Sequence, residues 1–248
     1  IVQVFPKTTP LEDQPRISHF SESLVRAALG TVPVEADGSV YCVAPVGKEI
    51  YFQLLDEHGV AVRSMRSGTY VHPGEKLQCA SCHEGRGRMP QRAVSTLARA
   101  RQPSTLKPEL QGVADLQPTE TVNYYRLVKP VLDARCAGCH HENRRGPDMS
   151  YASLANYLSG YEGRWNTLNK ARVGGSRTLA GQCGARAARL FADGYLTGQS
   201  TRCSGKVKLS DEELHRVTLW LDLNSNELGA YHDVEAQKEG KLVWPALD

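Results

Sequence analysis

The chain has 248 residues, of which 40% are hydrophobic and 23% are charged, so it is long enough to bury one large core or two smaller ones. No apolar run approaches the roughly 20 residues that a membrane-spanning helix needs, and a formal net charge of +3 is too small to indicate binding of nucleic acid. We therefore expect a globular protein with no membrane span and no nucleic-acid partner.

The N-terminal segment predicts little regular structure at first. Residues 1–18 contain three prolines and read as an arm or strap. Residues 20–30 predict a short helix that is capped by Ser21 and ended by Gly30. The chain begins at Ile1 without an initiator methionine or a secretion signal, so we expect either that a signal was removed or that this is part of a larger polypeptide.

A β-rich region follows. Alternating and β-branched segments between residues 32 and 71 (VPVEA, SVYCVAP, KEIYFQLL and VAVRSM) are separated by the turn pairs Asp37-Gly38 and His58-Gly59. This pattern predicts a small antiparallel, β-sandwich-like domain over residues 1–90, which ends in the pentapeptide CASCH at 79–83. Residues 91–118, broken by prolines, predict a linker.

The second half predicts helices. Residues 120–140 predict a helix that Pro130 bends or restarts and that runs directly into a second pentapeptide, CAGCH at 136–140. Further helices are expected near 151–160, at 185–196 and at 210–224, where Ser210 and Glu213 form a capping box. The predicted fold class is thus α+β, with a mostly helical, cytochrome c-like domain over residues 119–248.

The two Cys-X-X-Cys-His pentapeptides carry the chemistry. Two thiols with two intervening residues can bond the vinyl groups of one haem, and the histidine that follows then lies beneath the iron. The sequence therefore predicts two haem c cofactors. Haem 1 would be held by Cys79 and Cys82 with His83 on its iron, and haem 2 by Cys136 and Cys139 with His140.

Paired cysteines have two other interpretations. A four-thiolate zinc site would join pairs that lie farther apart than in a zinc ribbon, because residues 83–135 intervene. A dithiol redox site requires only the two cysteines, so it does not explain why a histidine directly follows the second cysteine in both pentapeptides. Three cysteines lie outside the pentapeptides. Cys183 and Cys203 are the pair most suited to form a disulfide, and Cys42 would then be unpaired.

The ligand on the far face of each iron decides between electron transfer and catalysis, since an empty position permits substrate binding. His215, in the C-terminal helix, is the candidate for haem 2. His72 is the candidate for haem 1 if the Pro73-Gly74 turn folds the chain back, and a vacant or water-bound position is the alternative. Tyr70 could hydrogen-bond a ligand there or belong to the core.

The stretch EIYFQLLDEHGVAVRSMRSGTYVHPGEKLQCASCHE, with VKPVLDARCAGCH and KVKLSDEELHRVTLWLDLNS, resembles the C-terminal dihaem half of the hydrazine synthase alpha subunit and its planctomycete-type relatives. The resemblance covers roughly residues 30–230. It implies a reactive haem 1 on a β-rich domain and an electron-relaying haem 2 on a helical one. The family's tyrosine a few residues after the first attachment histidine has no counterpart in EGRGRMP at 84–90.

These observations predict a dihaem c-type cytochrome that exchanges electrons with a redox partner protein or a small donor or acceptor. The alternative is a dihaem oxidoreductase whose open haem 1 acts on peroxide or a small nitrogen compound, so whether the chain is an enzyme is left open. Because haem is attached covalently outside the bacterial cytoplasm, we expect a periplasmic or extracellular location.

Overall fold

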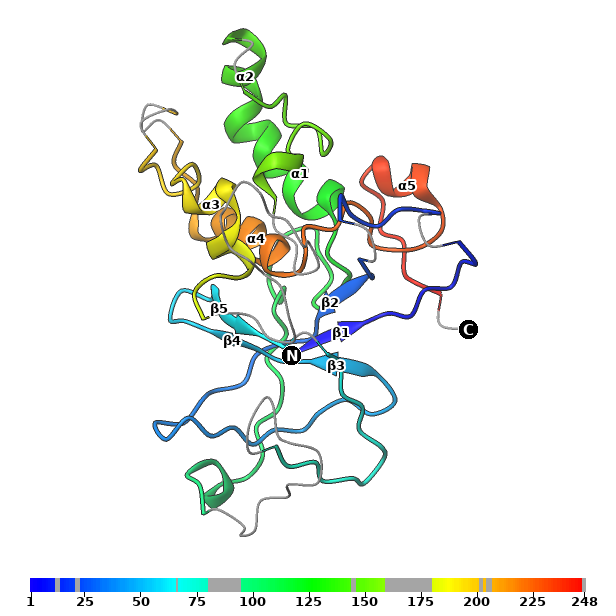
Figure 1. Ribbon diagram of the computed structural model, residues 1–248, viewed down its shortest axis with the longest axis vertical. Coiled ribbons are helices and arrows are strands. Elements are labelled where there is room, and N and C mark those ends of the chain that lie inside the picture. The colour runs from blue at the N-terminus through cyan, green and yellow to red at the C-terminus, as the bar shows by residue number, and fades with distance from the viewer. Residues whose placement is uncertain are drawn as a thin grey trace.

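A computed structural model describes residues 1–11, 14–20, 23–65, 67–79, 95–143, 146–158, 180–200, 203 and 207–246. Within these residues two small antiparallel sheets lie against a group of helices (Figure 1). The α+β class expected from the sequence is therefore confirmed.

The larger sheet has three strands in the order β2-β1-β3, formed by Val2–Val4 (β1), Arg26–Ala28 (β2) and Glu49–Tyr51 (β3). Val2 of the central strand pairs with Ala28 on one side and with Tyr51 on the other. The expectation of an N-terminal arm is therefore wrong for β1, which occupies the middle of a sheet.

The predicted helix over residues 20–30 is also corrected, because its buried part is strand β2. Val25, Arg26 and Ala27 are all buried, whereas a helix would expose one side of this run. The strand bonds β1 along one edge, and on the other edge the Arg26 carbonyl accepts a hydrogen bond from the Val122 backbone N–H at 2.9 Å. Pairing on both edges outweighs the local helix signal. The predicted cap, Ser21, lies outside the described residues.

The second sheet is the hairpin of β4 (Gln53–Leu55) and β5 (Ala61–Ser64), which follows β3 after Phe52 alone. Its turn lies at His58-Gly59 as predicted, with Gly59 at φ +74°. The Asp56 carboxylate accepts backbone N–H bonds from His58 and Val60 across this turn. Of the four predicted β segments, KEIYFQLL and VAVRSM form strands. SVYCVAP contributes only the isolated bridge between Cys42 and Ser104, and VPVEA forms neither strand nor bridge.

The helix that leads into the second pentapeptide is confirmed. It runs without a break through η2 (Tyr124–Val128), α1 (Lys129–Leu132), η3 (Asp133–Ala137) and α2 (Gly138–Asn143), of which η2 and η3 are π-helical. Pro130 lies in the first turn of α1, where its missing N–H costs least. The π-helical η2 changes to the α-helical α1 at this point, and the helical run continues through the proline.

The C-terminal helix α4 spans Asp211–Asp222 and begins with the predicted capping box. The Ser210 side chain accepts from the Glu213 N–H at 3.2 Å, and the Glu213 carboxylate accepts from the Ser210 N–H at 2.8 Å. The other helices are short: η1 (Ala98–Ala100), η4 (Ala155–Tyr157), η5 (Gly184–Ala187), α3 (Arg189–Ala192) and α5 (Val234–Lys238).

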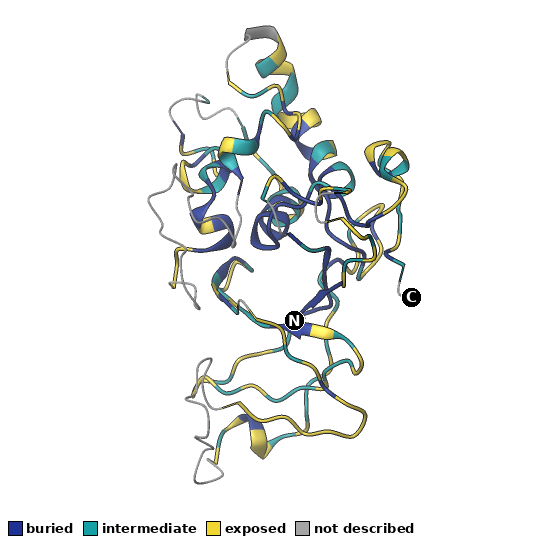
Figure 2. Cartoon of the chain, turned by 45° about the vertical axis from the view of Figure 1, so that its right-hand side comes forward, coloured by how far each residue is buried: buried dark blue, intermediate teal, exposed yellow. Residues whose placement is uncertain are grey.

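The main hydrophobic core joins the sheets to the helices, as the buried residues in Figure 2 show. Val2, Val4 and Tyr51 belong to the same cluster as Leu127 and Trp220. The sheets thus have helical packing partners, and the second pentapeptide is carried on an element anchored in this core. The division into two domains with a linker stays a prediction.

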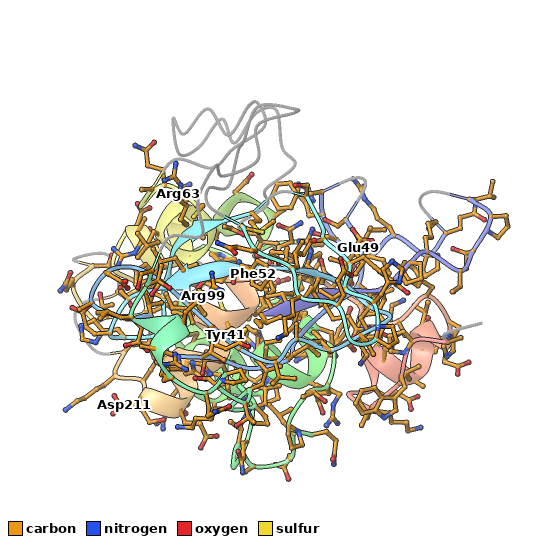
Figure 3. The ribbon with its side chains drawn as sticks, turned by 90° about the horizontal axis from the view of Figure 1, so that it is seen from below. Tyr41, Glu49, Phe52, Arg63, Arg99 and Asp211 are labelled. Carbon is orange, nitrogen blue, oxygen red and sulfur yellow. The ribbon has the colours of Figure 1, made fainter. Side chains whose placement is uncertain are left out.

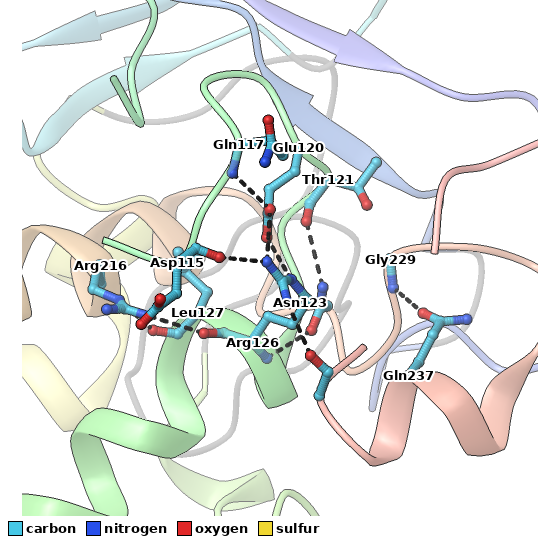
Figure 4. A network of polar contacts seen from close by, with 11 residues as sticks. Asp115, Gln117, Glu120, Thr121, Asn123, Arg126, Leu127, Arg216, Gly229 and Gln237 are labelled. Carbon is cyan, nitrogen blue, oxygen red and sulfur yellow. Dashed lines mark hydrogen bonds and ion pairs between the residues drawn. The ribbon is translucent and has the colours of Figure 1, made fainter. Parts of the chain in front are cut away.

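A buried ion pair fixes the start of that helix (Figure 4). The Arg126 guanidinium donates two hydrogen bonds to the Glu120 carboxylate, at 2.9 and 3.1 Å, and also donates to the carbonyls of Asp115 and Gly240. Glu120 is 1% exposed, so its charge is almost fully removed from water. The arrangement ties the segment before the helix to the C-terminal segment.

Candidate functional site

The second pentapeptide presents its donors on a helical surface. Cys136 lies in η3 and is half-buried, while Cys139 in α2 is exposed and His140 is half-buried. The two cysteines are three residues apart, and Cys139 is near enough to act electrostatically on Cys136. This spacing suits a group that is bonded at two points.

The His140 ring is covered along one edge by Gly146. A Cβ atom at Gly146 would lie 3.1 Å from His140 Cε1 and 3.3 Å from Nδ1, and Gly146 has a φ of +79°. His140 Nδ1 is buried without a hydrogen-bond partner. The neighbouring His141 instead lies near the Asp148 carbonyl, with 3.3 Å between its Nε2 and that oxygen. The two adjacent histidines therefore face different surroundings.

Burial raises the thiol pKa of two cysteines at this pentapeptide, Cys136 and Cys203. Burial, with smaller contributions from Cys203 and Cys139, raises the pKa of Cys136 to about 11. Burial, together with Cys139, also raises the pKa of Cys203. Reactive dithiols have a lowered thiol pKa, so these values do not favour the dithiol interpretation.

The predicted Cys183–Cys203 disulfide is absent, because Cys203 is a thiol in the structure. Cys183 is buried beside β5, where its Sγ lies 3.6 Å from the Val62 carbonyl oxygen. Cys203 lies instead within electrostatic range of the Cys136 and Cys139 thiols. The sequence separation allows the disulfide, but tertiary packing directs the two thiols to different neighbours. Cys42 is a half-buried thiol.

The four-cysteine zinc interpretation is not supported by the geometry. Within the described part of the chain, no three or more His, Cys, Asp or Glu side chains are gathered as metal ligands. Cys79, Cys136 and Cys139 all belong to that part, and they are therefore not brought to one place.

Only the first residue of the first pentapeptide is described. Cys79 is exposed, and the predicted donors Cys82 and His83 lie outside the described residues. Upstream, the Pro73-Gly74 turn forms as expected, with the Glu75 N–H donating to the His72 carbonyl at 3.1 Å and Gly74 at φ +75°. The His72 and Tyr70 rings meet edge to face with centroids 5.2 Å apart, so the two candidate side chains are neighbours.

His215 contacts a region distant in sequence from the second pentapeptide. Its Nε2 lies 3.4 Å from Glu109 Oε1, and a Cβ at Gly59 would lie 3.9 Å from its Nδ1. Its side chain is 26% exposed. A role as the far-face ligand of haem 2 stays a prediction, and it would require the imidazole to leave Glu109.

Three of these relationships were not predicted from the sequence. Glu109 sits in a proline-broken segment with no motif to indicate a histidine partner. The position of Cys203 depends on packing alone. The contact of Gly146 could have been expected from the sequence, because the Gly146-Pro147 pair soon after the second pentapeptide predicts a turn.

Comparison with known proteins connects this α+β chain to redox biochemistry. Residues 13–84 match the family described as hydrazine synthase alpha subunit middle domain, a segment that covers β2 to β5 and contains the whole first pentapeptide. The chain thus contains a region related to the hydrazine synthase alpha subunit, and this relationship supports a redox-related role.

A relative of known function is the hydrazine synthase subunit alpha of Kuenenia stuttgartiensis, which is 22% identical over 206 residues. The match covers 63% of this chain but 25% of that protein, so the chain corresponds to about a quarter of its length. As its name states, the relative is a subunit of a larger assembly. No solved structure matches the chain. None of the helices described here is long and apolar enough to span a bilayer.

Proposed function

We propose that the chain is a dihaem c-type cytochrome that transfers electrons between two covalently bound haems and an external redox partner. The observation that carries the proposal is the repeated Cys-X-X-Cys-His pentapeptide, at 79–83 and 136–140. The placement of Cys136 and Cys139 close together on one continuous helical run, beside a half-buried His140, supports it.

The residues at the second pentapeptide suit haem attachment. Cys136 and Cys139 would form the two thioether bonds, and His140 would bind iron through Nε2 because Gly146 covers the Nδ1 edge of its ring. When bound, haem supplies an iron that accepts and releases one electron. At the first pentapeptide Cys79, Cys82 and His83 would take the same roles, with His72 or an open position opposite His83.

Export is part of the proposal. Covalent haem attachment proceeds outside the bacterial cytoplasm, so a periplasmic or extracellular location follows from the proposed cofactors. The partner would be a redox protein or a small electron donor or acceptor.

A second candidate function is a dihaem oxidoreductase in which haem 1 has an open face and acts on peroxide or a small nitrogen compound. The match of residues 13–84 to a hydrazine synthase domain favours this candidate. The exposed pair of Tyr70 and His72 would then lie near the reactive face and orient a small ligand by hydrogen bonding. Haem 2 would act as the relay.

The test is to produce the chain in a periplasm that matures c-type cytochromes and to measure its mass and its haem content. Two haems are expected, one in the Cys136→Ala/Cys139→Ala variant, and two in the matched control Cys42→Ser. Fewer than two haems in the unaltered protein, or zinc in their place, would overturn the proposal. A redox titration should resolve two one-electron steps, and a high-spin ferric signal that responds to cyanide would favour the oxidoreductase.

A further inference from the structure

Four aromatic side chains form a connected cluster in the main hydrophobic core. The ring centroid of Tyr124 lies 5.4 Å from that of Tyr125, 5.5 Å from that of Tyr151 and 5.7 Å from that of Trp220. Tyr124 and Tyr125 come from η2, and Trp220 comes from α4, whose first residue, Asp211, is labelled in Figure 3. Rings at these distances are in contact, so the four side chains make one group.

The cluster adjoins the second pentapeptide. Cys136 packs against the same core that contains Tyr124 and Trp220, and it is near enough to act electrostatically on the Tyr124 phenol. Electron transfer slows steeply with distance, so aromatic rings in contact relay an electron in short steps. A cofactor bonded at Cys136 would therefore have a row of rings beside it.

Tyr125 differs from the other three rings in its hydrogen-bond acceptor. Its hydroxyl donates to Glu227 Oε1 at 2.7 Å, whereas the polar atoms of the other three rings donate to backbone carbonyls. A carboxylate takes up a proton at this distance, and a backbone carbonyl is far too weak a base to do so. Of the four rings, Tyr125 is therefore the one that can lose an electron and pass its proton directly to a base.

Glu227 is fixed in position for this contact. Its backbone N–H donates to the Ile17 carbonyl at 2.7 Å, and its carbonyl accepts from the Tyr124 N–H at 3.2 Å. Tyr125 and Glu227 are both half-buried. Burial, together with the hydrogen bond to Glu227, raises the pKa of Tyr125, which favours the protonated phenol. The pair thus combines a protonated phenol with a fixed proton acceptor at the edge of the core.

Building on the proposed function, we propose that Tyr125 is a redox-active tyrosine that returns an electron to haem 2, through Tyr124, after peroxide has oxidised the haems. Peroxide takes two electrons from the haems and, with two protons, becomes water. Tyr125 returns one of these electrons and its phenolic proton passes to the Glu227 carboxylate, which leaves a neutral tyrosyl radical beside a carboxylic acid. An enediol reductant such as ascorbate supplies the second electron and then restores Tyr125, which takes its proton back from Glu227.

Electron paramagnetic resonance tests this proposal on the two-haem protein, mixed with hydrogen peroxide and frozen. A tyrosyl radical is expected, and Tyr125→Phe should lower its signal about tenfold, because the ring stays but the hydroxyl that gives up the proton is lost. Tyr195→Phe is the matched control and should keep the signal, since Tyr195 is also half-buried and meets Tyr157 edge to face at 5.9 Å. Equal signals from the two variants, or no tyrosyl signal from the unaltered two-haem protein, would overturn the inference.

Glu227→Gln separates proton transfer from packing. Glutamine keeps an oxygen that can accept the Tyr125 hydrogen bond, but it cannot take up the proton. The radical signal should therefore fall severalfold, whereas a merely structural role of Glu227 would leave it unchanged and would contradict the proposed proton transfer. Haem content and thermal unfolding of each variant show that the fold is kept. Fewer than two haems in the unaltered protein would instead remove the proposed function, and this inference with it.

Discussion

Gly146 lies against the imidazole ring of His140, so close that a methyl group at this position would come within 3.1 Å of the ring. Gly146 takes the left-handed conformation, with φ at +79°. The contact holds the edge of the ring that carries Nδ1. Gly146 is therefore a positioning residue for the histidine proposed to bind iron.

Gly146→Ala should disturb this contact. Alanine in the left-handed region costs about 1 kcal/mol in stability, and its methyl would also displace the imidazole. We expect a shifted absorption spectrum and midpoint potential for haem 2. The control is Gly112→Ala, since Gly112 has a φ of +84° but a Cβ added there would meet no atom within 4 Å, so only the backbone cost remains. Identical spectra for the two variants would contradict the positioning role.

Glu120→Ala should be strongly destabilising. It leaves the Arg126 guanidinium, whose side chain is 15% exposed, buried without its counter-charge. Breaking such a pair costs about 3–5 kcal/mol. Asp133→Ala is the control, because the Lys129–Asp133 pair lies at the surface and should cost less than about 1 kcal/mol. Urea unfolding measures the free energy of unfolding of both variants. Similar losses of stability would show that the buried Glu120–Arg126 pair contributes no more than the exposed Lys129–Asp133 pair.

Asp222 should make the stability depend on pH. Burial raises its pKa from 3.8 to about 7, although its two oxygens accept N–H bonds from Ala185 and Ala61. The folded chain therefore keeps a proton that the unfolded chain releases, so stability falls as the pH rises from about 4 to 7, by up to about 4 kcal/mol. Asp222→Asn cannot titrate and should flatten this part of the profile. Equal slopes for both proteins in urea unfolding between pH 4.5 and 7.5 would contradict the prediction.

Ser210→Ala should destabilise helix α4 by about 1 kcal/mol, because the Glu213 N–H loses its acceptor. Ser210→Gly removes the same hydroxyl but suits the cap backbone, so it should cost only a few tenths of a kcal/mol. Thermal unfolding of the two variants should rank them in this order. The reverse order would mean that the capping box does not limit the stability of this helix.

Several elements followed from local sequence signals. The capping box of α4, the His58-Gly59 turn and the helix before the second pentapeptide were all predicted, because each depends on residues within a few positions of one another. The helix expected at 20–30 failed because β2 is stabilised by β1 and by Val122, which are distant in sequence. The disulfide expectation failed for a similar reason.

The sequence by itself determined the two pentapeptides, and with them the proposed cofactor chemistry, because thioether spacing is a property of five consecutive residues. Only the tertiary structure decided which side chains surround them: Gly146 against His140, Cys203 near Cys136, and Glu109 beside His215. It also paired the Tyr125 hydroxyl with the Glu227 carboxylate. Such neighbours depend on how distant segments pack, and no local pattern encodes that packing.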